Sequence, residues 1–306
     1  FFPETVARVA HQTGMRCQIS APIINFATSW SRDADDALHK TMALYDEYRY
    51  HPLIRVAFGP HSAYSLEHKH LNQIAMYADE LEAAVQIHLN ETQREVAQAH
   101  EQLGHGYVEL LRDTGLLGPR LQTVHMTQLT PAAIDMIAAA KTSVVHCPTS
   151  YMQMASGTCP VAQLQSQDVT VALGTDGAAS NNTQDLFAEL RLAGLLAKHA
   201  NADPTQGQAR DLLKMATLDG ARALGLEQDI GSLEVGKSAD LIALNTQQAN
   251  MVPVHDPFAS LVHNSSGSAV TTVMIAGNTL VSDGQLQKIN IDELCRKAQR
   301  WQLQLS

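Results

Sequence analysis

VQIHLNE, residues 85–91, contains a short apolar strand pattern that stops at a histidine, His88. Four more stretches of the chain follow the same rule and end on a histidine or an aspartate. They are VAFGPH ending at His61, LQTVH ending at His125, SVVHCP with His146, and VTVALGTD ending at Asp176. A helical pattern follows each stretch. Alternating strands and helices predict a parallel sheet that is covered on both faces, as in α/β folds.

The residues that end these strands are expected to lie together. In a closed (β/α)8 barrel, the side chains at the carboxyl ends of the strands converge on one mouth. The imidazoles of His61, His88, His125 and His146 and the carboxylate of Asp176 would meet there. Neutral imidazole and carboxylate are ligands that Zn²⁺ or Fe²⁺ accepts while a position stays open for substrate. The pattern therefore predicts a metal site at this mouth.

Composition excludes several classes of protein. The chain has 306 residues, of which 45% are hydrophobic and 17% charged, enough to bury the core of one barrel. A net charge of −10 argues against nucleic acid or an anionic membrane as a partner. No apolar run approaches the roughly 20 residues of a membrane span. The 4 cysteines lack CxxC spacing, which favours reduced thiols and a cytoplasmic protein.

The number of strands falls short of a complete barrel. RCQISAP, residues 16–22, adds one strand to the five above, whereas a (β/α)8 barrel has eight. If the strand that ends at Asp176 is the eighth, counting backward makes RCQISAP the third. We therefore expect the first two strands, and the N-terminal part of the protein with them, to be missing from this chain. Residues 1–225 are predicted to form the TIM-like barrel.

Helix patterns separate the strands, and a different pattern follows the last one. The predicted helices cover residues 3–14, 65–81, 92–115, 130–140, 182–200 and 208–225. After Gly225, GSLEVGKSADLIALNTQ (231–247) and AVTTVMIAGNTLVSDGQ (269–285) are strand and turn sequences. Residues 226–306 are therefore predicted to form a small β domain that ends in an amphipathic helix over 289–305.

Several motifs occur together in an order that points to a known family. They are GPHSAY (59–64), the HxxE pair His88 and Glu91, His125, GTDGAASNN (174–182) and GSLEVGKSADLIAL (231–244). In this arrangement the chain resembles the amidohydrolase superfamily. Within it, the chain is similar to the branch that contains 5'-methylthioadenosine/S-adenosylhomocysteine deaminases and triazine chlorohydrolases. The resemblance covers nearly the whole chain.

The resemblance implies a catalytic metal and roles for the residues around it. Zinc is expected, with Fe²⁺ as an alternative, held by His88 and Asp176 together with a first-strand HxH pair that this chain lacks. Asp176 would also accept a proton, Glu91 would bind the substrate and protonate its ring nitrogen, and His125 would orient the attacking hydroxide. His61 is expected to contact the nucleoside.

Each of these residues has a simpler explanation as well. Glu91 also fits the acidic first turn of the next helix, where the helix dipole favours it. Asp176 also fits a turn, since Thr-Asp-Gly is a turn sequence anywhere. His146 either lines the pocket as a substrate contact or forms a structural hydrogen bond. We expect it to line the pocket.

The activity implied by the resemblance is metal-dependent hydrolytic deamination of adenosine-type nucleosides, with release of ammonia. The substrates would be 5'-methylthioadenosine, adenosine or S-adenosylhomocysteine, and we expect a homo-oligomer. Two alternatives remain open. One is a chlorohydrolase or a guanine or oxopurine deaminase on the same scaffold. The other is an inactive, metal-free scaffold protein, which the missing HxH pair favours and the presence of His88, Glu91, His125 and Asp176 opposes.

Overall fold

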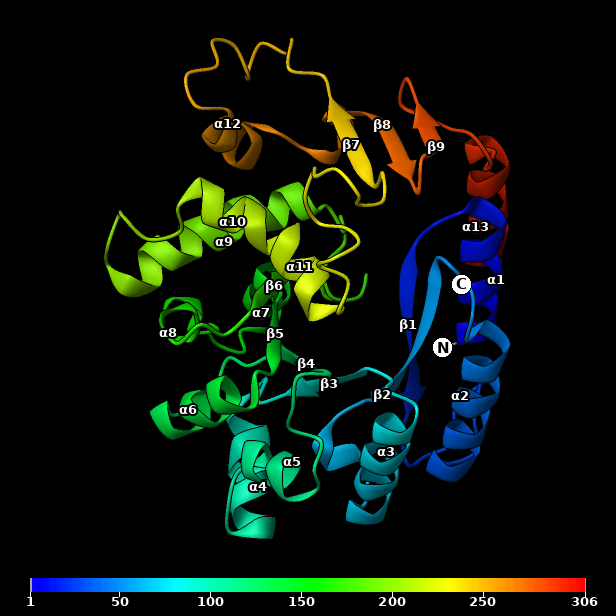
Figure 1. Ribbon diagram of the computed structural model, residues 1–306, viewed down its shortest axis with the longest axis vertical. Coiled ribbons are helices and arrows are strands. Elements are labelled where there is room, and N and C mark those ends of the chain that lie inside the picture. Colours follow the sequence, from blue (N-terminus) through cyan, green and yellow to red (C-terminus); the bar gives the residue numbers. More distant parts are fainter. Residues whose placement is uncertain (1, 306) are drawn as a thin grey trace.

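Two separate sheets organise the protein (Figure 1). The computed structural model describes residues 2–305 of the chain. One sheet has six parallel strands in the order β1-β2-β3-β4-β5-β6, and the other has four antiparallel strands in the order β10-β9-β8-β7. The parallel strands are β1 (Cys17–Ile23), β2 (Ile54–Pro60), β3 (Val85–Leu89), β4 (Leu121–His125), β5 (Ser143–His146) and β6 (Val171–Leu173). The antiparallel strands are β7 (Leu241–Leu244), β8 (Val270–Ile275), β9 (Asn278–Ser282) and β10 (Gln285–Leu286).

The helices of residues 2–225 surround the outer side of the curved parallel sheet in Figure 1. They are α1 (Pro3–Thr13), α2 (Ala34–Tyr48), α3 (His68–Glu80), α4 (Gln93–Leu103), α5 (Tyr107–Asp113), α6 (Pro131–Ala140), α7 (Pro148–Met154), α8 (Val161–Ser166), α9 (Leu186–Asn201), α10 (Ala209–Met215) and α11 (Leu218–Ala223). Two more helices, α12 (Pro257–Asn264) and α13 (Ile291–Leu305), accompany the antiparallel sheet, and short 3-10 turns cover Ala63–Ser65 and Gly267–Ala269. No helix within residues 2–305 is both long and apolar enough to cross a membrane.

The register of the parallel strands brings their carboxyl ends to the same level. Leu89 at the end of β3 lies opposite His125 at the end of β4. One step earlier, His88 pairs with Val124, and Val124 pairs with Val145 on β5. Because paired residues in a sheet point to the same face, His88, Val124 and Val145 share one face of the sheet.

Polar side chains fill the opposite end of this face. The Nε2 of Gln18 on β1 donates to Oε1 of Gln122 on β4 at 2.8 Å, and Gln122 donates in turn to the carbonyl of Ala223 at 2.8 Å. Gln122 is 1% exposed, so these bonds satisfy an amide that would otherwise be buried without partners. They also hold β1 and β4 at a fixed spacing beneath the functional end of the sheet.

An ion pair links the antiparallel sheet to the strand at the edge of the parallel sheet. Arg16, just before β1, donates from Nη2 to Oδ1 of Asp240 and to Oγ of Ser238, both at 3.0 Å. The backbone N–H of Ala276 donates to the same Asp240 oxygen at 2.8 Å. Since these side chains are largely shielded from water, the guanidinium–carboxylate pair fixes the small sheet against β1.

Comparison with the sequence expectations confirms a parallel α/β sheet and a C-terminal antiparallel sheet, and all six expected parallel strands are present. The single helix expected over 92–115 is wrong, because Gly104 adopts a φ of 75° and ends α4 before α5 begins. The helix expected over 208–225 is likewise two helices, separated at Thr217, where φ is −127° and ψ is −93°. The pattern does not anticipate α2. Closure into a barrel is not seen among the described residues, since β1 and β6 form the two edges of the sheet.

One glycine is required where β2 passes β1. A Cβ atom at Gly59 would lie 2.7 Å from the carbonyl oxygen of Ala21 and 3.0 Å from Ser20. We therefore expect Gly59→Ala to push the two strands apart just before His61 and to lower the free energy of unfolding by about 1 to 3 kcal/mol. Equilibrium unfolding in urea measures the change.

Gly118→Ala is the matched control, because no atom lies within 4 Å of the added Cβ. Its effect on the free energy of unfolding should stay within about 0.5 kcal/mol. Equal effects of the two substitutions would show that the close approach of β1 and β2 does not constrain residue 59.

Candidate active site

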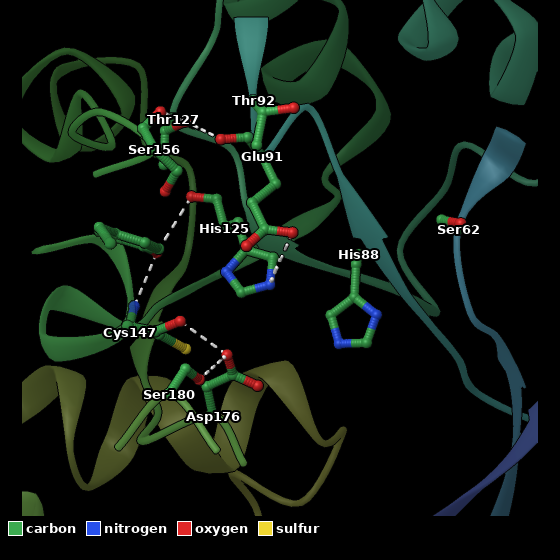
Figure 2. A network of polar contacts seen from close by, with 12 residues as sticks. Ser62, His88, Glu91, Thr92, His125, Thr127, Cys147, Ser156, Asp176 and Ser180 are labelled. Carbon is green, nitrogen blue, oxygen red and sulfur yellow. Dashed lines mark hydrogen bonds and ion pairs between the residues drawn. The ribbon is translucent and has the colours of Figure 1, made fainter. Parts of the chain in front are cut away.

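Two histidines and an aspartate converge at the carboxyl ends of the parallel strands (Figure 2). His88 comes from β3, His125 from the end of β4, and Asp176 from the loop after β6. One potential ligand atom from each side chain lies within 4.8 Å of the others. The two ligands expected from the sequence, His88 and Asp176, are therefore together, and His125 adds a third candidate ligand that the sequence analysis gave only a catalytic role.

The tautomer of His88 is set by a backbone carbonyl. Its Nδ1 lies 2.7 Å from the carbonyl oxygen of His61 at the end of β2. A carbonyl only accepts, so Nδ1 carries the proton and Nε2 keeps a free lone pair. This is the arrangement in which a histidine binds a metal through Nε2 while its other nitrogen is fixed by a neighbouring acceptor.

His125 is held neutral in a strained turn. The residue adopts a φ of 81°, and Met126 after it a φ of 53°, so the chain turns sharply at the end of β4. The side chain is 2% exposed, and Nδ1 has no hydrogen-bond partner among the described residues. Burial, together with the neighbouring His88, lowers the pKa of His125 to about 4, although Asp176 acts in the opposite direction. The imidazole is therefore uncharged near neutral pH.

Asp176 is held as a carboxylate by three donors. The hydroxyls of Ser150 and Ser180 each donate to Oδ2 at 2.7 Å, and the backbone N–H of Gly177 donates to Oδ1 at 2.7 Å. Burial acts to raise the pKa of Asp176, but these hydrogen bonds and the nearby His125 outweigh it, and the pKa lies below its usual value. A half-buried anion among hydroxyl and imidazole groups favours a cation beside it.

The pKa of the second carboxyl group of the site, that of Glu91, is shifted in the opposite direction. Its Oε2 lies 3.8 Å from Nε2 of His125, and its side chain is mostly buried. Burial raises the pKa of Glu91, and the charge of Asp176 raises it further, while His88 acts against this. Glu91 therefore keeps a proton at a higher pH than an ordinary glutamate, which suits a group that donates a proton to a substrate.

Of the two remaining histidines, the structure brings only His61 to this site. The His61 ring contacts the His88 ring edge-on, with centroids 5.2 Å apart, and burial lowers its pKa, with a further contribution from His88. His146 faces away, which corrects the expectation that it lines the mouth. Val145 shares the face of His88, and because β5 stays extended, the next residue, His146, points to the opposite face. His125 differs because its φ of 81° turns its side chain away from the strand alternation. Its ring lines a separate cavity of about 170 Å³ beneath α8, α9 and α10.

The groups that hold this site in place are not among the residues expected from the sequence. They are the hydroxyls of Ser150 and Ser180 on Asp176, and two buried glutamates, Glu95 and Glu189. Glu189 accepts from the backbone N–H of Thr149 at 3.1 Å and from Asn181 Nδ2 at 2.8 Å, which joins the start of α7 to the loop after Asp176. For Glu95 a signal was present, because Thr92-x-x-Glu95 is the capping-box pattern of a helix start.

The residues present fit a divalent metal such as zinc. Zinc binds imidazole nitrogen and carboxylate oxygen at about 2.0 to 2.2 Å, and catalytic sites use about three protein ligands. His88 offers a free Nε2, His125 an uncharged imidazole, and Asp176 an ionised carboxylate. The uncharged state of His125 matters here, since a protonated imidazole cannot bind a metal.

Comparison with known proteins shows the family of this chain. The sequence model that describes the amidohydrolase family matches residues 2–280 of this chain. A 5-methylthioadenosine/S-adenosylhomocysteine deaminase of Teredinibacter turnerae is 44% identical over 305 residues, which is 100% of this chain and 69% of that protein. The structure of an adenosine deaminase from Xanthomonas campestris with bound zinc has a TM-score of 0.97 and 40% identity, and the match covers 99% of this chain and 69% of that one.

A more distant structure shares the fold alone. It is that of an atrazine chlorohydrolase from Arthrobacter aurescens complexed with zinc. Its TM-score is 0.88 at 23% identity, and the match covers 97% of this chain and 68% of that one. The branch of the superfamily expected from the sequence motifs is thus confirmed by both sequence and structure.

The burial of His146 predicts how stability depends on pH. Burial lowers its pKa from 6.5 to about 3, so between these values the unfolded chain binds a proton that the folded chain refuses. This group therefore lowers the free energy of unfolding as pH falls, by up to about 1.4 kcal/mol per pH unit. We expect His146→Gln to make the loss of stability between pH 6.5 and pH 4 less steep, as measured by urea unfolding across this range.

His199→Gln is the control, because it removes a histidine from the exposed end of α9. It should leave the slope of stability against pH unchanged. A slope equally steep in the His146→Gln protein and the parent would mean that His146 takes up its proton in the folded state.

Proposed function

The chain belongs to the amidohydrolase family, and on this basis we propose that it is a metal-dependent hydrolytic deaminase of adenosine-type nucleosides that releases ammonia. The observation that carries the proposal is the meeting of His88, His125 and Asp176 within 4.8 Å, with the proton-holding carboxyl of Glu91 beside them. The relatives at 40% and 44% identity are an adenosine deaminase and a 5-methylthioadenosine/S-adenosylhomocysteine deaminase. The substrates proposed for this chain are therefore 5'-methylthioadenosine, adenosine and S-adenosylhomocysteine.

The alternatives have less support. The chlorohydrolase that shares this fold is 23% identical, which carries no argument about the reaction. An inactive scaffold would have no use for an ionised carboxylate, two imidazoles and a second carboxyl with a raised pKa in one place.

Zinc is the metal that the site and its relatives favour. When bound, zinc lowers the pKa of water from 15.7 to about 7 to 9, so that a nucleophile is available near neutral pH. The residues proposed to hold the metal are His88 and Asp176, and a ring nitrogen of His125 lies within 4.8 Å of the ligand atoms of both. The hydrogen bond from His88 Nδ1 to the His61 carbonyl keeps that imidazole in the required tautomer.

The two carboxyl groups divide the proton transfers between them. Asp176, whose pKa is lowered, is ionised and accepts the proton of the attacking water. Glu91, whose pKa is raised, protonates the purine ring nitrogen next to the carbon under attack. Protonation of that nitrogen withdraws electron density from the adjacent carbon and makes this carbon a better electrophile. Ammonia then leaves after a proton passes to the amino group, a transfer that these two carboxyl groups supply.

Neutral His125 positions the attacking oxygen and stabilises the negative charge that develops during attack. Its Nε2 lies 3.8 Å from Oε2 of Glu91, and one of its ring nitrogens lies within 4.8 Å of a carboxylate oxygen of Asp176. His61 contacts the nucleoside, since it is exposed beside His88 at the end of β2. His146 has no such role in this proposal, because it lies on the other face of the sheet.

We propose that the six parallel strands are part of a (β/α)8 barrel. The unpaired edges of β1 and β6 support this, because a parallel sheet with helices outside it closes when two further strands join those edges. We also propose residues 1–225 as the barrel domain and 226–306 as the small β domain. The separate antiparallel sheet β7–β10 supports this division.

The cellular setting is proposed on similar grounds. The cysteines Cys17, Cys147, Cys159 and Cys295 are all free thiols, which supports a cytoplasmic enzyme. Helix α13 exposes Ile291, Leu294 and Trp301, and this apolar surface supports a homo-oligomer.

Removal of one ligand should weaken metal binding. We expect Asp176→Asn to lower the affinity for Zn²⁺ by at least about 100-fold, because it removes the ionised oxygen of the cluster. Competition with a chromogenic chelator measures the affinity. Asp168→Asn makes the same charge change at an exposed position after α8 and should leave it unaltered. Equal affinities of the two variants would place the metal elsewhere.

The role of Glu91 predicts a second effect. Glu91→Gln keeps the shape of the side chain but removes its proton, so zinc content should be unchanged while turnover falls by about 10²- to 10⁴-fold. Ammonia release from adenosine and 5'-methylthioadenosine measures turnover. Glu101→Gln, on the exposed side of α4, is the control. Near-normal turnover of Glu91→Gln would show that Glu91 has no catalytic role and serves only as an acidic residue near the start of a helix.

A further inference from the structure

A buried carboxylate lies directly behind the catalytic glutamate. Glu95, in the first turn of α4, is 6% exposed, yet no cation pairs with it among the described residues. Its two oxygens instead accept backbone N–H groups: Oε1 accepts from Asn90 at 2.9 Å, and Oε2 accepts from Glu91 at 2.7 Å. Burying a carboxylate costs free energy unless its oxygens find donors. The position of Glu95 therefore depends on this one turn of the chain.

The turn in question decides where the Glu91 side chain points. Strand β3 ends at Leu89, and Asn90 then adopts a φ of 50°, in the left-handed region that most residues avoid. This residue reverses the direction of the chain between the strand and helix α4. The two N–H groups that Glu95 binds most closely belong to this reversal, and neither belongs to the helix; the N–H of the cap residue Thr92 contributes least.

The carbonyl group of Glu91 is also held, in the next peptide group. The hydroxyl of Thr127, in the loop after β4, lies 2.6 Å from the carbonyl oxygen of Glu91 (Figure 2). The main chain of Glu91 is thus fixed at its N–H by Glu95 and at its carbonyl by Thr127. Its side chain is left free to reach His125, at 3.8 Å from Oε2 to Nε2.

We propose that Glu95 is a positioning residue for the deaminase reaction: its carboxylate fixes the turn at Asn90 and Glu91 and so holds the Glu91 carboxyl over the metal site. The inference rests on the proposed function. A carboxylate is needed because it offers an acceptor oxygen to each N–H, whereas an amide offers one oxygen and turns an NH₂ group toward the other donor.

A purely structural reading assigns Glu95 to the cap of α4. The hydroxyl of Thr92 does accept the N–H of Glu95 at 3.2 Å, as in a helix cap. A cap of this kind stabilises the first turn of the helix. The bonds to residues 90 and 91 lie before Thr92, however, and only the positioning role requires that they affect the chemistry at Glu91.

Glu95→Gln in the zinc-loaded enzyme tests the proposal. We expect kcat to fall by about 10- to 100-fold, the range typical of groups that orient catalytic residues, with KM and zinc affinity within about 3-fold of the parent. Amide exchange measured by NMR should speed up at Asn90 and Glu91 and stay unchanged along α4. Glu101→Gln, the exposed control on the same helix, should change none of these quantities.

A double substitution separates positioning from general weakening. If Glu95 acts through the Glu91 carboxyl, then Glu95→Gln added to Glu91→Gln should lower kcat no further. Independent, multiplying losses would overturn the proposal, as would a change confined to KM or unaltered exchange at residues 90 and 91. Should Glu95→Gln fail to fold, Thr127→Val removes the hold on the Glu91 carbonyl and should give the same fall in kcat with zinc retained.

The exchange measurement needs no substrate, so the two proposals can fail separately. A parent protein that deaminates no adenosine-type nucleoside overturns the proposed function. Faster exchange confined to Asn90 and Glu91 in Glu95→Gln still supports the hold of Glu95 on the turn.

Discussion

An ionised, half-buried carboxylate beside two imidazoles is the constraint on which the site depends. Asp176 keeps its charge because Ser150, Ser180 and the Gly177 N–H donate to it, and these bonds outweigh the cost of burial. The same charge favours a cation between Asp176 and the neighbouring imidazoles. The left-handed backbone at Asp176 and His125 is strain that the surrounding hydrogen bonds and packing must offset. Strain of this kind is consistent with residues placed for chemistry.

The division of labour between the two carboxyl groups follows from their surroundings. Glu91 lies in a largely buried position where its side chain lacks direct donors like those on Asp176, so its pKa rises. Asp176 lies a short distance away among donors, and its pKa falls. Two carboxyl groups with opposite shifts are the arrangement that supplies an acid and a base at one pH. A hydrolytic deaminase needs both, because water loses a proton while the substrate gains one.

Much of this structure follows from the sequence by simple rules, and the exceptions have physical causes. Apolar runs that end on His88, His125 and Asp176 predict strands whose ends meet, and the structure brings these residues together. His146 shows the limit of the rule, since which face a strand residue occupies depends on register, and one step along β5 reverses it. The break at Gly104 is local and readable, but helix periodicity on both sides conceals it. Glu95 carries a helix-start signal that gives no hint of its bonds to the preceding turn.

The claim that this chain is a hydrolytic deaminase is tested most directly by following the oxygen atom. The zinc-loaded enzyme is incubated with adenosine and with 5'-methylthioadenosine in water enriched in ¹⁸O, and the products are analysed by mass spectrometry together with ammonia. The account predicts one ¹⁸O atom per turnover, as the carbonyl oxygen that replaces the amino group of the purine, and one ammonia. Both products should be lost when a chelator removes the metal. Stoichiometric zinc at His88, His125 and Asp176 with no labelled product from any adenosine-type nucleoside would contradict it.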